Sequence, residues 1–151
     1  MDGYTKLPKK NLMMILISSA VIIMMCSVEV MIMTKDADVY RHWIQALGNE
    51  VSGFTDTQIF NAYLSVQLSR YFIKVIVPIM VSIHSYFAYV KLRINKLFVL
   101  IWSILTVGEL AYHLSAMNLQ SVLFYISLIS YLFLIYSILS LNTVINLGRN
   151  K

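Results

Sequence analysis

Acidic residues, glycine, proline and cysteine are all scarce in this sequence of 151 residues. It contains seven Asp and Glu, five Gly, two Pro and a single Cys. One cysteine, Cys26, excludes an intrachain disulfide and any zinc or redox motif built from several cysteines. Cys26 lies within an apolar run and is interpreted as a small packing residue, with acylation or an intermolecular bond as the alternative.

The sequence motifs of common enzyme classes are missing as well. There is no glycine-rich phosphate loop, no Cys-x-x-Cys, no His-Glu-x-x-His and no nucleophile elbow. A haem held by two histidines is not expected, because His84 and His113 fall at different depths of their segments. These absences argue against a self-contained ATPase, a kinase or an enzyme acting on soluble substrates. No metal and no cofactor is predicted.

Long hydrophobic runs dominate what is present. Hydrophobic residues make up 59% of the chain and charged residues 13%, and the mean hydropathy is +0.73, outside the usual balance of a soluble domain. We therefore predict an all-α polytopic membrane protein with a single membrane domain over residues 1–151, whose partner is the lipid bilayer. The predicted four-helix bundle has spans at 11–33, 71–90, 97–117 and 119–145, and a helical extracytoplasmic loop at 34–70.

The basic residues are divided unequally between the two sides of this predicted bundle. Eight fall on one side: Lys6, Lys9, Lys10, Lys91, Arg93, Lys96, Arg149 and Lys151. The other four fall on the loop side, where acids roughly balance them: Lys35, Arg41, Arg70 and Lys74. The positive-inside rule predicts a multi-pass protein of the cell (plasma) membrane with both termini cytoplasmic. Since the basic residues do not form one patch, nucleic acid is not expected as a partner.

The loop between the first two spans begins with an amphipathic pattern. Val39, Trp43 and Leu47 recur at spacings of four, which places them on one face of a helix. Asp38 is the expected N-cap and Gly48 the expected stop. We interpret this helix as lying on the membrane or packing over the end of the bundle, with a partner-binding lid as the alternative.

A second helix is expected to start in the same loop. Thr55 and Gln58 have the spacing of a capping box, which predicts a helix beginning near Asp56. No helix-breaking residue follows until Pro78, so this helix should continue into the second span and bend there. Lys74 and its neighbour Arg70 are expected to extend their charged ends toward water.

Two ionisable residues lie inside the third span. Glu109 and His113 are four residues apart and share a helix face with Trp102 and Thr106. Measured from the start of the span at 1.5 Å per residue, they lie ~18 Å and ~24 Å deep. A carboxylate there costs about 2.5–3.5 kcal/mol to insert. The pair is predicted to face protein and to bind a proton or cation, or alternatively to stabilise helix packing and nothing more.

Glu29 lies near the outer end of the first span and is the third candidate for a proton- or ligand-binding residue. It is interpreted as an interfacial acid that reaches water or pairs with a base such as Lys74. The alternative places it beside His113, so that Glu29, Glu109 and His113 form one polar cluster.

Small residues recur on two of the predicted helices, where another helix can approach closely. These predicted packing faces consist of Gly108, Ala111 and Ser115 in the third span and Ser127, Ser130 and Ser137 in the fourth. Tyr112 and Tyr131 lie within the spans and are expected to need internal hydrogen-bond partners.

Three functions fit these observations. The first is a non-enzymatic accessory, regulatory or immunity-type protein that packs against another membrane protein or against itself. The second is a small proton- or cation-coupled transporter that works as an oligomer through Glu109 and His113. The third is an intramembrane enzyme acting on a lipid or quinone, for which no nucleophile or metal triad is visible.

Overall fold

The computed structural model describes residues 6–48, 52–115 and 121–149, and all of their regular structure is helical. Four helices are long and apolar enough to cross a membrane, which confirms the prediction of a helical membrane protein with four such segments. The helices are α1 (Lys9–Lys35), α2 (Ala37–Leu47), α3 (Asp56–Val90), α4 (Lys96–Ser115) and α5 (Val122–Arg149).

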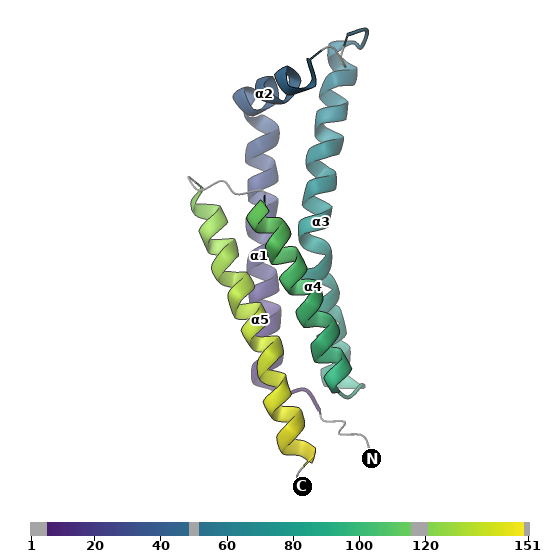
Figure 1. The fold of residues 1–151 in the computed structure, drawn as a ribbon, viewed down its shortest axis with the longest axis vertical. Coiled ribbons are helices and arrows are strands. Elements are labelled where there is room, and N and C mark those ends of the chain that lie inside the picture. Colours follow the sequence, from purple (N-terminus) through teal and green to yellow (C-terminus); the bar gives the residue numbers. More distant parts are fainter. Residues whose placement is uncertain (1–5, 49–51, 116–120, 150–151) are drawn as a thin grey trace.

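The four long helices form one bundle, with α1 packed between α3 and α5 (Figure 1). Helix α4 packs on α5 and, less extensively, on α3. The order around the bundle is therefore α1, α3, α4, α5, which places α1 and α4 diagonally opposite each other. The start of α1 and the end of α5 lie at one end of the bundle, and α2 lies at the other (Figure 1).

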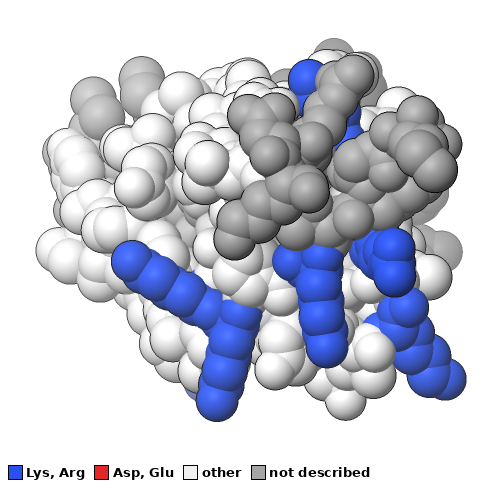
Figure 2. Space-filling model, turned by 90° about the horizontal axis from the view of Figure 1, so that it is seen from below, with Lys and Arg blue, Asp and Glu red and all other residues white. Residues whose placement is uncertain are grey.

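The end opposite α2, called the basic end below, carries a concentration of positive charge. Figure 2 views this end and shows Lys and Arg side chains extending from it, with no Asp or Glu visible among its described residues. The basic residues of this end whose side chains the structure describes are Lys6, Lys9, Lys10, Lys91, Arg93 and Lys96.

Apolar side chains fill the bundle toward the basic end. Leu12, Phe98 and Ile145 are buried there and come from three different helices. Asn11 joins α1 to α5, because its Nδ2 donates a hydrogen bond to Ser140 Oγ at 2.6 Å. The described residues of this half of the bundle contain no buried charged side chain. Dispersion and close packing therefore stabilise this end.

The amphipathic pattern after the first span does form a helix, α2, but its N-cap was wrongly predicted. Asp36 is the N-cap, and its Oδ1 accepts hydrogen bonds from the amides of Asp38 and Val39 at 2.9 and 3.2 Å. Asp36 has extended backbone angles just before the first helical residue, as this type of cap requires. Asp38 instead pairs with Arg41 at 3.1 Å. Gly48 ends the helix as predicted, with φ of 54°.

Helix α2 contacts the far end of α3 through aromatic rings. The ring of Tyr63 lies 5.1 Å from that of Tyr40 and 5.4 Å from that of Trp43, measured between centroids. The Tyr63 hydroxyl also donates to the carbonyl of Met33 at 2.6 Å, which links α3 to α1. No residue of α2 is itself buried. Helix α2 therefore packs across this end of the bundle, as one of the two sequence interpretations expected.

Helix α3 begins with the predicted capping box. Gln58 Oε1 accepts from the Thr55 amide at 2.9 Å, and Thr55 Oγ1 accepts from the Gln58 amide at 3.4 Å. The helix then continues through Pro78 to Val90. At 1.5 Å per residue α3 is ~52 Å long, whereas α4 is ~30 Å long, the thickness of a hydrocarbon core. Helix α3 therefore extends well beyond the end of α4 toward α2.

Candidate functional site

Glu109 and His113 lie on the buried face of α4. Their exposed fractions are 6% and 1%, and the same face carries Trp102 and Thr106, as the sequence predicted. This face points into the bundle, so both ionisable groups face protein within the described residues. Both interpretations of the pair, proton or cation binding and the stabilisation of helix packing, require the Glu109 carboxylate to lie inside the bundle.

Aromatic rings enclose His113. Its imidazole stacks on the Phe124 ring, with centroids 5.0 Å apart and planes 14° from parallel, and lies 5.5 Å from the Tyr131 ring. Neither nitrogen of His113 and neither carboxylate oxygen of Glu109 has a hydrogen-bond partner within the described residues. Burying such groups unpaired is costly. The pair is therefore the strongest candidate in the described structure for binding a proton or cation.

Glu29 pairs with Lys74 instead of joining Glu109 and His113. Lys74 Nζ lies 2.7 Å from Glu29 Oε2, and the two side chains are 10% and 17% exposed. This confirms the interpretation in which Glu29 finds a base on the second span. The helix order explains it, because α1 packs directly on α3, whereas α4 lies across the bundle from it. The alternative cluster of three residues is not formed by direct contact.

Tyr131 connects these two polar pairs. Pro78 has no amide hydrogen, so the carbonyl four residues earlier, that of Lys74, lacks its helical donor. The hydroxyl of Tyr131 donates to this carbonyl at 3.2 Å, while the ring of the same residue lies beside His113. The prediction that Tyr131 needs an internal partner is thus confirmed, and the partner is the backbone group that Pro78 leaves without a donor.

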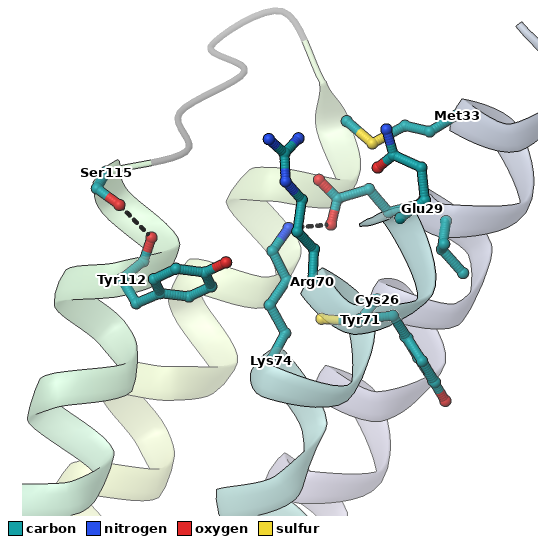
Figure 3. A pocket seen from close by; sticks show the side chains of 10 residues that line it. Cys26, Glu29, Met33, Arg70, Tyr71, Lys74, Tyr112 and Ser115 are labelled. Carbon is teal, nitrogen blue, oxygen red and sulfur yellow. Dashed lines mark hydrogen bonds and ion pairs between the residues drawn. The ribbon is translucent and has the colours of Figure 1, made fainter. Parts of the chain in front are cut away.

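A pocket of about 400 Å³ lies above the ion pair, on the side of α2. Figure 3 shows the ion pair and Arg70 on one side of this pocket and Tyr112 with Ser115 on the other. The pocket reaches the protein surface at Arg70 and Ser115, both of which are exposed. Its lining comes from α1, α3 and α4 and consists of Cys26, Glu29, Val30, Met33, Gln67, Arg70, Tyr71, Lys74, Tyr112 and Ser115.

The sequence contains a signal for this pocket in the spacing of three polar residues on α3. Gln67, Arg70 and Lys74 recur at intervals of three and four residues, so they form a polar stripe on one face of α3. Taken separately, Arg70 and Lys74 are expected to extend toward water, and Lys74 is also the base expected to pair with Glu29. Taken as one stripe that faces Glu29, they predict a charged lining between two helices.

The two predicted packing faces have different surroundings. Ser127, Ser130 and Ser137 are buried on α5, the helix that packs on α1 and α4. The residues Gly108, Ala111 and Ser115 are exposed on α4. A Cβ atom placed on Gly108 would meet no atom within 4 Å. No described helix of this chain therefore packs against these three residues, which are called the Gly108 face from here on.

The other histidine of the bundle has a different environment from His113. His84 Nδ1 accepts a hydrogen bond from Trp102 Nε1 at 3.1 Å, and its ring packs on Phe98 near the basic end. The described residues contain no group of three or more His, Cys, Asp or Glu placed to hold a metal ion. His84 therefore contributes to packing, and the ionisable site is confined to α4 and its neighbours.

Comparisons with protein-family models, with curated proteins and with solved structures find no match.

Proposed function

We propose that this chain is a non-enzymatic accessory, regulatory or immunity-type membrane protein, and that it acts by packing the Gly108 face of α4 against a transmembrane helix of a partner. The partner is another membrane protein or a second copy of the chain. The proposal also places the protein in the cell membrane with the basic end in the cytoplasm, because Lys and Arg are concentrated there.

The exposure of the Gly108 face carries this proposal. Gly108, Ala111 and Ser115 lie side by side on α4 with no helix of the described chain against them. Small residues let two helix backbones approach closely, and close packing drives helix association where there is no hydrophobic effect between helices. The serines of α5, by contrast, are already covered. The α4 face is therefore the one available to a partner.

Site-directed photo-cross-linking in native membranes tests the proposal. A benzophenone attached to Ala111→Cys, in a Cys26→Ser background, should form an adduct in good yield. An adduct of twice the chain mass indicates self-association, and any other defined mass indicates a different partner. The same probe on Leu139→Cys of α5, which is exposed and lies on another helix, is the matched control and should give no such adduct.

A substitution at Gly108 provides the decisive arm of this experiment. Gly108→Leu should abolish the adduct, because a bulky side chain prevents close approach of a second helix. The open space at Gly108 and the higher helix propensity of Leu mean that the variant should fold normally, which a melting curve verifies. An adduct that survives Gly108→Leu, or none with the original glycine, contradicts the proposal.

A specific observation also favours a second function, that of a small proton- or cation-coupled transporter. Glu109 and His113 are buried without hydrogen-bond partners among the described residues, on the helix that also lines the pocket through Tyr112 and Ser115. In proteoliposomes, Glu109→Gln should then abolish pH-dependent uptake or binding. Uptake that persists unchanged in this variant excludes Glu109 as the coupling group.

A further inference from the structure

The pocket at the α2 side of the bundle carries an excess of positive charge. Its charged lining consists of Glu29, Lys74 and Arg70, so one negative group stands against two positive ones. The carboxylate of Glu29 is engaged by Lys74 at 2.7 Å. Arg70 lies one helical turn before Lys74 on the same helix and has no ion pair among the described residues. The pocket therefore has a net charge of about +1 and one unneutralised guanidinium.

The groups around this charge can donate further hydrogen bonds. Lys74 Nζ has three hydrogens and gives one to Glu29, so two remain. Tyr112 and Gln67 also line the pocket, and Figure 3 shows the ring of Tyr112 facing Lys74 and Arg70 across it. A divalent cation does not fit, because Glu29 is the only acid among the described lining residues and is already paired. The hydrogen-bond donors of the pocket and its net positive charge both favour an anionic ligand.

The volume of the pocket and its position along the membrane normal further narrow the class of anion that it can bind. At about 400 Å³ the pocket exceeds a bare inorganic anion and falls in the range of sites for small organic ligands. Helix α4 is ~30 Å long and so matches a hydrocarbon core. Its last turn, which contributes Tyr112 and Ser115, consequently lies at the level of the lipid headgroups. The phosphodiester of an anionic phospholipid is an organic monoanion found at that height.

We propose that this pocket binds the phosphodiester of an anionic phospholipid headgroup, with Arg70 and Lys74 as the phosphate-binding residues. The planar guanidinium of Arg70 donates two parallel hydrogen bonds to phosphate oxygens. Lys74 contributes a third donor while it keeps its contact with Glu29. The phosphate-binding residues Arg70 and Lys74 lie on α3, outside the Gly108 face, and Ser115 is the residue that borders both. The proposal does not require that face to bind a partner.

Native mass spectrometry of the full chain in a neutral detergent tests this site. The protein is titrated with phosphatidylglycerol and, separately, with phosphatidylcholine. The original chain should retain phosphatidylglycerol in preference. Arg70→Gln should lower that retention about tenfold, the ratio expected for the loss of a charge-assisted hydrogen bond, and Arg70→Lys should restore part of it.

Arg41→Gln is the matched control, since Arg41 lies on α2 outside the pocket and pairs with Asp38. It should bind phosphatidylglycerol like the original chain. Equal binding by the original chain and Arg70→Gln, or an equal loss in Arg41→Gln, overturns the proposal. Because Arg70 is exposed, its substitution should leave the melting temperature unchanged.

A competition arm distinguishes a lipid from a soluble ligand of the same chemistry. Excess glycerophosphoglycerol, which has the headgroup but no acyl chains, is added to the complex with phosphatidylglycerol. Displacement supports recognition of the phosphodiester alone, from either source. Retention of the lipid, together with its loss in Arg70→Gln, supports the site with the phospholipid as its ligand.

Discussion

The two pairs of ionisable residues inside this bundle differ in how their polar atoms are satisfied. Glu29 and Lys74 come from different helices and meet at 2.7 Å. Glu109 and His113 come from the same helix and have no hydrogen-bond partner within the described residues. The first pair borders a pocket that reaches the surface, whereas the second is enclosed by Phe124 and Tyr131.

This difference indicates what each pair contributes. A paired acid and base joins two helices, and removing one partner leaves an uncompensated charge in the bundle. Unpaired groups contribute little to stability and are retained in membrane interiors mainly where they bind or transfer something. We therefore expect substitutions of the first pair to change the stability of the fold and substitutions of the second to change function at nearly constant stability.

The largest effect is expected from Lys74→Met. The variant keeps the volume of the side chain and leaves the Glu29 carboxylate without its partner, so the free energy of unfolding should fall by about 3–5 kcal/mol. Unfolding in mixed micelles of increasing SDS fraction measures it. The double variant Glu29→Leu/Lys74→Met should regain most of the loss. A double variant as unstable as the single one would show that the pair is not the cause.

An intermediate effect is expected from Tyr131→Phe, which touches both pairs. The change leaves the Lys74 carbonyl without a donor and should cost about 1–2 kcal/mol. In a Pro78→Ala background the restored backbone amide supplies that donor, so the same change should cost less than about 0.5 kcal/mol. A double-mutant cycle in the same micelles measures both. Equal costs in the two backgrounds would assign the hydroxyl another role.

The smallest effect on stability is expected from Glu109→Gln. Because no partner is lost and the shape is kept, the free energy of unfolding should change by less than about 0.5 kcal/mol. Glu29→Gln is the matched control, since it is the same chemical change in a paired residue and should be clearly destabilising. If the two variants proved equally unstable, the proposed contrast between the pairs would be wrong.

Much of this fold follows from local chemistry that is visible in the sequence. Hydropathy predicts four long helices, and Thr55 with Gln58 fixes the start of α3 at the predicted residue. The face of α4 that carries Glu109 also follows from helical periodicity alone. Asp38 is misassigned as a cap because two aspartates lie at the start of the same helix, and only the backbone conformation shows that Asp36 is the cap.

The pocket and the pairing of Glu29 depend on which helices are neighbours. Helical periodicity assigns Arg70 and Lys74 to a face of α3, but it does not say that this face meets α1. The role of Tyr131 is only partly predictable from the sequence. Its need for a partner follows from its depth, whereas the partner itself, a carbonyl four residues before Pro78, depends on the arrangement of the bundle, in which the Tyr131 hydroxyl of α5 reaches α3.

The missing backbone donor at Pro78 makes the upper part of α3 dependent on another helix for its rigidity. The segment from Asp56 to Lys74 carries both the aromatic contact with α2 and the cations of the pocket, and the Tyr131 hydroxyl braces it at its base. With this hydrogen bond formed, α3 behaves as one rigid helix. Without this hydrogen bond the segment can bend at Pro78, and a movement of α2 would then also displace Arg70 and Lys74.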